Sequence, residues 1–583
     1  MQQPLLSIRD LMVSFGSMHA VNGISLDIMP GEIIGIVGES GSGKSVTALS
    51  LMRLLQHPGR ITGGSLQYHL SGSKMPVTDI ARLSEDEMRS WRGNEIAMIF
   101  QEPMTSLNPL HTCGHQVMEA LLLHKRGMNR EAARLQTLAL FKQVRLSDPE
   151  LIMDRYPHQL SGGQKQRVMI AMAISCQPRL LIADEPTTAL DVTVQKTVLE
   201  LLKDLQKQTG MSVVFITHDL GVIAEIADRV AVMYKGRIVE EASVAQLFTH
   251  PQHPYTKGLL ACRPPLDKRL FRLPVTRDFM ETDLHGEIVE KAQEVKAFVH
   301  SLEMPQDFIA GREAMLAQRP LLLEVKDLHT WFPARKNLFG KVISWTKAVN
   351  GVSFDIREGE TMGLVGESGC GKTTLGRTLL RLAEPTSGSI WYKGKDITTL
   401  PAGALRDLRK DIQIIFQDPY SSLNPRMTIG RAIEEPMKVH GLYGTEQVRR
   451  ERVRELLTKV NLLPEHYDRY PHEFSGGQRQ RIVIARALAL EPSFIICDES
   501  VAALDVSIQA QVLNLLLQLR DEFGFTSIFI SHDLSVVRFI SDRMMVMNRG
   551  QIEEAGPAAD VYEQPKSEYT RQLINSIPKN IYV

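Results

Sequence analysis

The sequence predicts an α/β protein made of two copies of one domain, and three observations lead to this class. A glycine-rich stretch, Gly-Glu-Ser-Gly-x-Gly-Lys-Ser/Thr, occurs twice, at Gly38–Ser45 and at Gly366–Thr373. Each copy lies between a short apolar, strand-like stretch and a helix-like stretch. Further matching segments follow both copies in the same order, which indicates a duplicated domain rather than a solenoid of short repeats.

Length and composition bound the class of protein. With 583 residues, of which 43% are hydrophobic and 23% charged, the chain has the size of about two to four soluble domains. We expect a first domain over residues 1–263, a linker over 264–320 and a second domain over 321–583. The net charge of +0 gives no electrostatic reason to expect nucleic acid as a partner. Neither a signal peptide nor a membrane-spanning helix is expected.

Each glycine-rich stretch is predicted to bind phosphate. Its glycines let backbone N–H groups turn inward around phosphate oxygens, and the following helix adds partial positive charge. Lys44 and Lys372 can reach the β- and γ-phosphates, while the hydroxyls of Ser45 and Thr373 can ligate Mg²⁺. The expected nucleotide contacts are Gly38, Ser40, Gly41, Gly43, Lys44, Ser45 and Val46 in the first copy, and Gly366, Ser368, Gly369, Gly371, Lys372, Thr373 and Thr374 in the second.

Two apolar strands in each half end in polar residues. Leu180–Glu185 and Phe494–Glu499 run directly into Asp-Glu, and Val213–His218 and Ser527–His532 end in histidine. Ligands gather at the carboxyl ends of buried parallel strands, whereas a solvated turn is the plain alternative for an Asp-Glu pair. We expect Asp184 and Asp498 in the magnesium shell, Glu185 and Glu499 beside the attacking water, and His218 and His532 as sensors of the γ-phosphate.

A second anion-binding element follows in each half. Ser161-Gly162-Gly163-Gln164 and Ser475-Gly476-Gly477-Gln478 precede the helix-like stretches Val168–Ser175 and Ile482–Leu490. Ser-Gly-Gly at the start of a helix offers N–H groups to an anion. One nucleotide can occupy two such sites within a domain only if they lie close together, but a pair of domains can share it.

Together these motifs resemble those of the ATP-binding cassette (ABC) family over nearly the whole chain. The resemblance also includes Gln101 and Gln417 and the turns Ala189–Asp191 and Ala503–Asp505. It implies that each half has a P-loop fold, with a RecA-like α/β core, an antiparallel β subdomain and an α-helical subdomain. It further implies that Gln101 and Gln417 join the magnesium ligands and that Phe15 and Phe332 stack on adenine.

The resemblance implies two composite ATP sites, both of them catalytic. One consists of Lys44, Ser45, Gln101, Asp184, Glu185 and His218, closed by Ser475, Gly476 and Gly477; the other consists of Lys372, Thr373, Gln417, Asp498, Glu499 and His532, closed by Ser161, Gly162 and Gly163. The second copy departs from the family pattern in having Ser500-Val501 where the first has Pro186-Thr187. Because no catalytic atom is lost, we expect an altered rate rather than lost activity.

The segments after the two glutamines resemble the peptide/nickel importer branch of the family. Gln101–Pro109 and Gln417–Pro425 share Ser-Leu-Asn-Pro, and the tails His253–Thr256 and Glu568–Thr570 also match. The fused form is most similar to glutathione-type importers, with microcin/oligopeptide-type ATPases second and nickel or another small solute as alternative cargo. The resemblance implies two polytopic membrane permease subunits, a separate substrate-binding protein, one fused ATPase chain per transporter, and a peripheral position on the cytoplasmic face of the inner membrane.

A soluble tandem cassette ATPase that acts on ribosomes or nucleic acid is the alternative function. The zero net charge and the importer-type segments argue against it. The five cysteines (Cys113, Cys176, Cys262, Cys370 and Cys497) match no zinc-binding spacing, and a reducing, cytosolic location fits them. The first tail offers only Cys262, so no iron–sulfur cluster is expected.

The linker contains a possible amphipathic helix. Leu284, Ile288, Ala292, Val295, Val299 and Leu302 recur at helical spacing. A covalent tether with no other role is the alternative.

Overall fold

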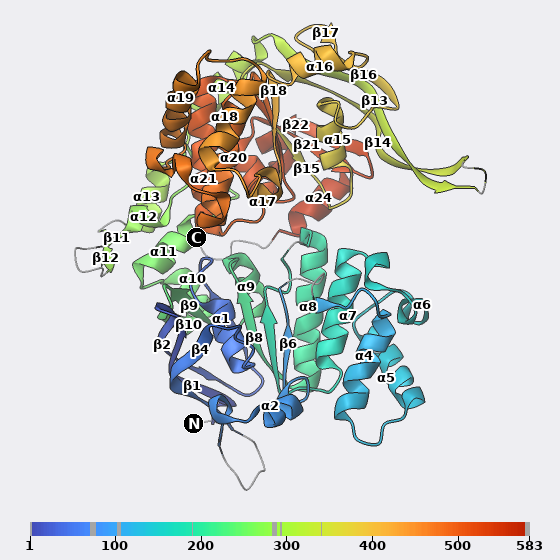
Figure 1. Ribbon diagram of the computed structural model, residues 1–583, viewed down its shortest axis with the longest axis vertical. Coiled ribbons are helices and arrows are strands. Elements are labelled where there is room, and N and C mark those ends of the chain that lie inside the picture. The colour runs from blue at the N-terminus through green and yellow to red at the C-terminus, as the bar shows by residue number, and fades with distance from the viewer. Residues whose placement is uncertain are drawn as a thin grey trace. The chain divides into compact units, whose positions relative to one another are not determined.

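The structure is a computed structural model of the chain (Figure 1), and it describes residues 3–69, 77–101, 106–188, 190–282, 288–291, 294–337, 339 and 341–577. The chain divides into two compact units. Unit 1 holds Met1–Leu260 and Phe279–Lys291, and unit 2 holds Ala261–Asp278 and Ala292–Ile577. The stretch 264–320, expected as a linker, is therefore shared between the two units, and the chain crosses repeatedly from one unit to the other within it.

Unit 1 is built around a six-stranded sheet in the order β10-β9-β3-β8-β7-β6, in which only β10 is antiparallel to its neighbour. The strands are β3 (Ile33–Val37), β6 (Ile96–Ile99), β7 (Leu180–Asp184), β8 (Ser212–Thr217), β9 (Arg229–Tyr234) and β10 (Arg237–Ser243). Every residue of β3, β7 and β8 is buried, as expected for parallel strands covered on both faces. Because β8 pairs with both β3 and β7, the carboxyl ends of these three strands meet at one edge of the sheet.

A second, antiparallel sheet covers part of this core, in the order β2-β1-β4-β5. Its strands are β1 (Leu6–Phe15), β2 (Met18–Ile28), β4 (Gly59–Tyr68) and β5 (Thr78–Asp79). Apolar side chains from β1, β2 and β4 join those of β3, β7, β8 and β9 in one hydrophobic cluster. This shared cluster fixes the antiparallel sheet on the core.

The helices of unit 1 fall into two groups. One group, α4 (Cys113–His124), α5 (Arg130–Gln143), α6 (Pro149–Met153) and α7 (Gly162–Ile174), gathers at the end of the unit opposite the antiparallel sheet (Figure 1). The other helices are α1 (Lys44–Leu51), α2 (Glu85–Trp91), α8 (Val192–Thr209), α9 (Leu220–Ile226), α10 (Val244–Thr249) and α11 (Pro254–Ala261), and short 3-10 turns lie at Ile80–Arg82 and Pro157–Gln159. The first group forms the α-helical subdomain that the family resemblance implies.

Unit 2 repeats this architecture. Its six-stranded sheet has the order β18-β19-β20-β15-β21-β22, and its antiparallel sheet has the order β14-β13-β16-β17. The strands are β13 (Leu321–Lys336), β14 (Val342–Arg357), β15 (Thr361–Val365), β16 (Ser387–Tyr392), β17 (Lys395–Asp396), β18 (Ile412–Ile415), β19 (Phe494–Asp498), β20 (Thr526–Ile530), β21 (Arg543–Asn548) and β22 (Gln551–Pro557). The predicted α/β class with two P-loop domains is confirmed.

The helices of unit 2 follow the same plan. They are α12 (Thr276–Phe279), α13 (Val295–Ser301), α14 (Gln306–Ala317), α15 (Lys372–Leu379), α16 (Ala402–Leu408), α17 (Pro419–Ser422), α18 (Ile429–Val439), α19 (Glu446–Lys459), α20 (Gly476–Leu488), α21 (Val506–Phe523), α22 (Leu534–Ile540), α23 (Ala558–Glu563) and α24 (Glu568–Asn575), with 3-10 turns at Pro464–Asp468 and Pro471–Glu473. Helices α18, α19 and α20 make up the counterpart of the α-helical subdomain in unit 1.

The single amphipathic helix expected over residues 284–302 is wrong in its first part. Ile288 lies in β12 (Ile288–Glu290), which pairs with β11 (Met280–Thr282), and a helix begins only at Val295. Leu284 and Ala292 lie outside the described residues. Ile288-Val289 are β-branched neighbours that favour a strand, and apolar residues spaced by three and four do not by themselves exclude one.

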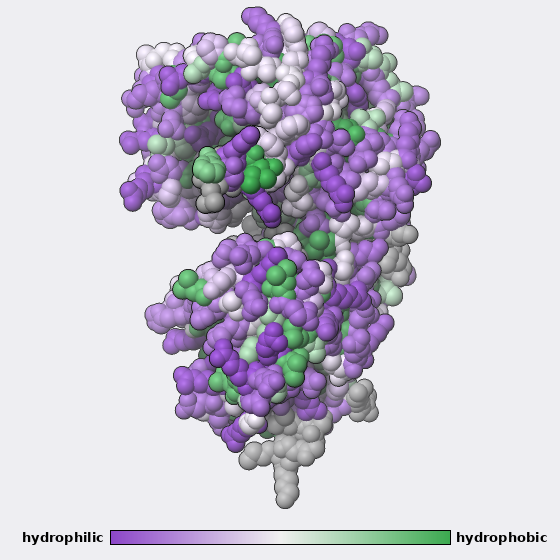
Figure 2. Space-filling view, turned by 90° about the vertical axis from the view of Figure 1, so that its right-hand side faces the viewer, coloured by the Kyte–Doolittle hydropathy of each residue, from purple (hydrophilic) through white to green (hydrophobic). Residues whose placement is uncertain are grey.

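No helix within the described ranges is both long enough and apolar enough to cross a membrane. On the face drawn in Figure 2, hydrophobic residues are scattered among hydrophilic ones rather than gathered in a broad band.

Candidate functional site

The two phosphate loops have the same geometry. The Nζ of Lys44 donates to the carbonyl oxygens of Gly38 at 2.6 Å and Glu39 at 2.9 Å. The Nζ of Lys372 likewise donates to Gly366 at 2.8 Å and Glu367 at 2.9 Å. Each buried ammonium group is thus folded over its own loop, where the phosphate oxygens are expected.

Glycine is required where each loop enters its helix. Gly43 and Gly371 are the N-caps of α1 and α15, with φ of 101° and 114°. A Cβ at these positions would lie 2.7 Å from the Ala20 carbonyl oxygen and 2.0 Å from that of Ala348. A larger residue would therefore push the loop out of shape. The other predicted loop contacts, including Ser40, Val46, Ser368 and Thr374, lie in the same loops and first helical turns.

A hydroxyl and a carboxylate meet beside each loop. Ser45 Oγ donates to Asp184 Oδ1 at 3.1 Å, and Thr373 Oγ1 donates to Asp498 Oδ1 at 3.0 Å. Burial raises the pKa of Asp184 to about 6, because the bond from Ser45 offsets it only in part and the Glu185 charge adds to it. Burial raises the pKa of Asp498 in the same way. A buried carboxylate beside a hydroxyl is a pair of hard oxygen donors that fits Mg²⁺.

The glutamate after each strand is held by its predicted neighbours. Gln101 Nε2 donates to Glu185 Oε2 at 3.0 Å, and His218 Nδ1 lies 3.2 Å from Glu185 Oε1. In unit 2, Gln417 Nε2 donates to Glu499 Oε2 at 2.7 Å, and His532 Nδ1 lies 3.6 Å from that oxygen. The structure therefore brings together the glutamine, glutamate and histidine of each half.

Both glutamates are kept ionised. Burial opposes the charge of Glu185, but His218, Thr188 and Lys44 outweigh it and hold the pKa of Glu185 below its ordinary value. Burial is likewise outweighed at Glu499 by His532 and Lys372, so its pKa is also lowered. An ionised carboxylate in this position can accept a proton from water.

The backbone at both glutamates is strained. Glu185 and Glu499 have φ of 48° and 47°, a left-handed conformation that costs a residue other than glycine about 1–3 kcal/mol. Their N–H groups donate to Ile216 O at 2.9 Å and Ile530 O at 3.0 Å, one strand further along the sheet. The sheet thus holds each glutamate at a sharp turn directly after its strand.

Comparison with known proteins identifies this arrangement. The family model described as "ABC transporter" matches residues 21–188 and 349–502, which together cover more than half of the chain.

The chain belongs to the ABC transporter family.

Each of its two cassettes is an ATP-binding domain of an ATPase that is coupled to transport. The model "Oligopeptide/dipeptide transporter, C-terminal region" also matches twice, at residues 239–278 and 553–581. This second match places the chain in the peptide importer branch.

Relatives match the fused chain nearly from end to end. The "Glutathione import ATP-binding protein GsiA" of Pectobacterium atrosepticum is 50% identical, over 99% of this chain and 90% of the relative. The proteins of the same name from Salmonella typhimurium and Escherichia coli O157:H7 are each 50% identical, over 98% of this chain and 89% of the relative. A solved dimeric ATP-binding cassette in a post-hydrolysis state with ADP and Pi is 28% identical, covers 41% of this chain and 99% of its own, and has a TM-score of 0.37.

The Ser-Gly-Gly-Gln motif of each cassette begins a helix. Ser161 caps α7 by accepting from the Gln164 N–H at 3.3 Å, and Gln164 Oε1 accepts from the Ser161 N–H at 3.0 Å. Ser475 and Gln478 form the same capping box at α20. The side chains of Gln164 and Gln478 therefore first serve to shape the helix start. Gly162, Gly163, Gly476 and Gly477 form the first turns of these helices.

The two aromatic residues expected at adenine differ in their surroundings. Phe15 is the last residue of β1 and is half-buried. Its ring lies against Gly59, where an added Cβ would be 2.5 Å from the ring. Phe332 lies within β13, and 44% of it is exposed. The β13–β14 hairpin projects from unit 2 (Figure 1). Strand β14 contains β-branched and aromatic residues, which favour strands.

The contact of Thr188 with Glu185 and that of Lys372 with Glu499 were not predicted. Thr188 Oγ1 donates to Glu185 Oε2 at 2.9 Å, and the matching residue of the second cassette is Ala502. The sequence shows this difference, because the second cassette differs from the first not only at Ser500-Val501 but also at the next residue, Ala502. In the second cassette the Nζ of Lys372 lies 4.0 Å from Glu499 Oε1. The two glutamates thus share a glutamine and a histidine partner, and the Thr188 hydroxyl of the first cassette is replaced by an alanine in the second.

The tail tyrosines are also part of the site. Tyr255 Oη accepts from the Glu39 N–H at 3.0 Å, and Tyr569 Oη accepts from the Glu367 N–H at 3.2 Å. Both tyrosines lie in the segments that match the oligopeptide transporter C-terminal region. In the sequence these segments indicate only the branch, because nothing in a linear sequence places the tail beside the loop.

We expect Tyr255→Phe together with Tyr569→Phe to raise the KM for ATP about threefold to tenfold, with a smaller change in kcat. Each substitution removes the phenolic oxygen that accepts from a loop N–H, which costs about 1 kcal/mol per site. Steady-state phosphate release against ATP concentration measures both constants. Tyr156→Phe, at an exposed tyrosine, is the control. An unchanged KM in the double variant would show that the phenols do not support the loops.

Proposed function

We propose that the chain is the ATPase subunit of an importer for glutathione or similarly short peptides. The observation that carries the proposal is 50% identity to glutathione import ATP-binding proteins over nearly the full length of both chains. The paired matches to the oligopeptide transporter C-terminal region support the same class of cargo. Nothing in the comparisons favours a ribosomal or nucleic-acid role.

Hydrolysis is proposed to occur at both cassettes. Each has a complete set of a loop lysine, a strand-end carboxylate, a glutamate, a glutamine and a histidine, joined by the contacts described above. Glu185 and Glu499 would take the proton of the attacking water, while His218 and His532 would hold those carboxylates and contact the γ-phosphate. Lys44 and Lys372 would bind the phosphate oxygens.

Mg²⁺ would be held by Ser45, Asp184 and Gln101 in one cassette and by Thr373, Asp498 and Gln417 in the other. When bound, the ion neutralises charge on the β- and γ-phosphates. The hydroxyl–carboxylate contacts of 3.1 and 3.0 Å support this proposal, because they bring two oxygen donors together in each cassette.

Each ATP is proposed to be shared by the two cassettes. Ser475, Gly476 and Gly477 would close over the nucleotide at Lys44, and Ser161, Gly162 and Gly163 over the one at Lys372. The glycines in the first turns of α20 and α7 support this role, because the N–H groups at the start of a helix can bind an anion. ATP would then hold the cassettes together, and hydrolysis would release them.

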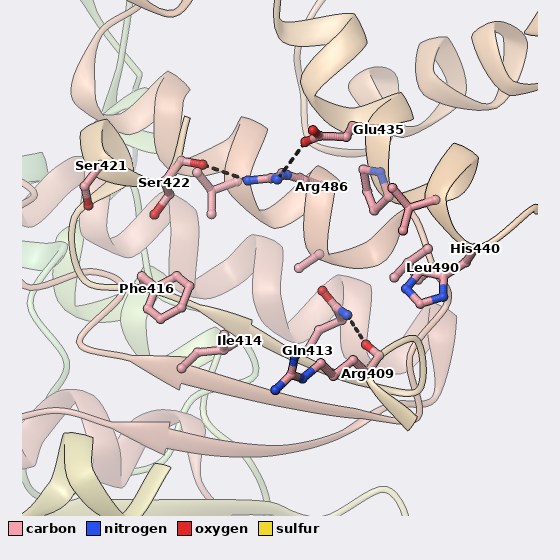
Figure 3. A pocket seen from close by; sticks show the side chains of 14 residues that line it. Arg409, Gln413, Ile414, Phe416, Ser421, Ser422, Glu435, His440, Arg486 and Leu490 are labelled. Atoms are coloured by element: carbon pink, nitrogen blue, oxygen red, sulfur yellow. Dashed lines mark hydrogen bonds and ion pairs between the residues drawn. The ribbon is translucent and has the colours of Figure 1, made fainter. Parts of the chain in front are cut away.

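Membrane permease subunits are the proposed partners, and unit 2 has a cavity that suits one of them. The cavity, of about 710 Å³, lies between the core and the α-helical subdomain, just after Gln417 (Figure 3). Phe416, Ile414 and Leu490 line it, and Arg486 spans its wall by donating to Ser422 O at 2.8 Å and Glu435 at 3.1 Å. An apolar floor beside the glutamine loop can accept a helix of a membrane subunit and transmit its movement to Glu499.

The proposed transporter has one fused chain on the cytoplasmic face of the inner membrane, two permease subunits and a separate substrate-binding protein. The test is to purify the chain with the membrane subunits encoded beside it and reconstitute them in liposomes. Addition of the binding protein loaded with glutathione should stimulate ATPase activity several-fold and drive uptake of labelled glutathione.

The two halves of the proposal can fail separately. If a different solute, such as nickel or a longer peptide, gives the stimulation, the substrate assignment is wrong and the transport assignment holds. If no membrane subunit co-purifies and the chain sediments with ribosomes instead, the transport assignment is wrong.

A further inference from the structure

The segment after the first cassette is folded into the second one. Ala261–Asp278 belongs to unit 2, and Cys262, Leu270 and Leu273 are buried in its hydrophobic core, at 0%, 1% and 0% exposure. Phe271 N–H donates to Leu302 O at 2.9 Å, and Met304 N–H donates to Arg269 O at 2.8 Å. This segment is therefore an integral part of the second cassette rather than a free tether.

One side chain of α21 holds the backbone of this segment. Asn514 Oδ1 accepts from the Leu273 N–H at 2.8 Å, and Asn514 Nδ2 donates to Leu273 O at 2.8 Å. Both polar groups of a buried residue are thus satisfied by a single amide. The two bonds hold Leu273 on the surface of α21 and also fix its position along the helix axis.

The same face of α21 contacts the signature helix α20. Ile508, Gln511 and Asn514 are spaced by three residues and lie on one side of the helix. A Cβ at Gly477 would lie 2.4 Å from Ile508 Cγ2, so α20 packs directly on α21 there. Gln511 Oε1 accepts from Arg481 Nη2 at 3.0 Å. One helix face therefore links the segment to the Ser-Gly-Gly-Gln motif.

A cavity of about 830 Å³ opens where these three elements meet. The segment contributes Phe271, Arg272, Val275 and Arg277 to its lining, and the motif contributes Ser475, Gly477 and Gln478. Figure 1 shows α12, at the end of the segment, on the same side of unit 2 as α21. The segment thus forms part of the immediate surroundings of the second signature motif.

The first cassette has other residues at the matched positions. Its α8 carries Thr197 where α21 has Gln511, and an exposed Glu200 where α21 has Asn514. Arg481 is 9% exposed, whereas its counterpart Arg167 is only partly buried. The described contacts therefore distinguish the second signature from the first.

We propose that Arg269–Asp278 is a positioning strap for the second signature motif and that Asn514 connects the strap to that motif through α21. This inference rests on the proposed sharing of ATP between cassettes. The strap then acts on the nucleotide bound at Lys44, which Ser475 closes, and not on the nucleotide bound at Lys372. Asn514 is a positioning residue in this scheme, because it acts through Gln511, Arg481 and Gly477.

The experiment measures nucleotide binding at each loop separately, in the full-length chain. Glu185→Gln and Glu499→Gln block hydrolysis, and a third substitution, Lys372→Ala or Lys44→Ala, leaves one loop able to bind. A fluorescent ATP analogue is titrated into each form. Asn514→Ala should weaken binding at the Lys44 loop about tenfold, from the loss of two hydrogen bonds to the buried Leu273, and leave the Lys372 loop within about twofold.

Three comparison variants make the outcome decisive. Glu200→Ala, at the matched position of α8, should change neither loop. Asn514→Asp keeps the acceptor for the Leu273 N–H and should recover part of the affinity, which a general loss of folding would not allow. Ser475→Arg obstructs the motif itself and should weaken the Lys44 loop.

The strap is refuted if Asn514→Ala weakens nucleotide binding equally at both loops. It is also refuted if Asn514→Ala weakens binding at neither loop while Ser475→Arg still weakens it at the Lys44 loop. In this second case shared ATP binding stands. If Ser475→Arg has no effect at the Lys44 loop, shared binding is refuted and the strap with it.

Discussion

Replacing Glu185 and Glu499 together by glutamine should lower ATP turnover by about a hundredfold or more, while ATP still binds. Glutamine keeps the shape of the side chain but cannot accept the proton of the attacking water, and a positioned base contributes about 10²–10⁴-fold to such a step. The loop lysines and the Ser45–Asp184 and Thr373–Asp498 pairs are untouched, so nucleotide should remain bound in a closed state. Phosphate release and retention of labelled ATP on the protein measure the two effects.

Single substitutions and a surface control complete this test. If the two sites hydrolyse independently, Glu185→Gln and Glu499→Gln alone should each keep about half of the activity, because the general base of the other site is intact. Glu200→Gln with Glu446→Gln, at exposed positions, should keep full activity. Near wild-type turnover in the Glu185/Glu499 double variant would mean that neither glutamate is the base.

Replacing Arg312 by leucine should lower the free energy of unfolding of unit 2 by about 3–5 kcal/mol, because it leaves a buried carboxylate without its main partner. Asp542 is 4% exposed and accepts from Arg312 Nε at 2.6 Å and from Arg312 Nη2 at 2.9 Å. Arg269 donates to Ser541 O at 2.7 Å beside it. Urea unfolding followed by tryptophan fluorescence suits the measurement, since Trp331, Trp345 and Trp391 all lie in unit 2.

The pH dependence of this loss has a definite sign. Burial raises the pKa of Asp542, but the bond and charge of Arg312, the Thr361 N–H and Arg269 outweigh it and hold the pKa below its usual value. The stabilisation is therefore present above the unfolded pKa of about 3.9 and is lost as pH falls through the folded pKa. The gap between wild type and Arg312→Leu should narrow on acidification. Arg312→Leu combined with Asp542→Asn should be more stable than Arg312→Leu alone, and equal stability would contradict the buried-charge explanation.

The parts of the site that consist of neighbouring residues in the chain could be predicted from the sequence. Each loop, its flanking strand and the strand-end Asp-Glu and histidine are local patterns, and parallel pairing brings strand ends to one edge of a sheet. The contacts of Ser45 with Asp184 and of Gln101 with Glu185 follow from that rule. The left-handed backbone of the two glutamates does not, because it depends on a hydrogen bond to the neighbouring strand.

The contacts that sequence did not predict are formed by segments far apart in the chain. Tyr255 and Tyr569 reach their loops from more than two hundred residues away, and their segments were recognisable only as a mark of the branch. The residues of the strap match no motif. The role of Asn514 can be assigned only from its hydrogen bonds to Leu273, which lies far away in the chain. The helix expected over 284–302 was wrong where Ile288 pairs in a hairpin, because apolar spacing alone does not distinguish the two structures there.

The interleaving of the two units bears on how the chain is made. Residues 279–291, with β11 and β12, belong to unit 1 but are synthesised after 261–278, which belongs to unit 2. Leu270 and Leu273 are therefore translated before α21, although in the folded chain they share a hydrophobic cluster with it. Such apolar side chains stay accessible to other chains during that interval. Neither half is a contiguous stretch of polypeptide, so a gene split at any single codon would separate a piece of one half from its own core.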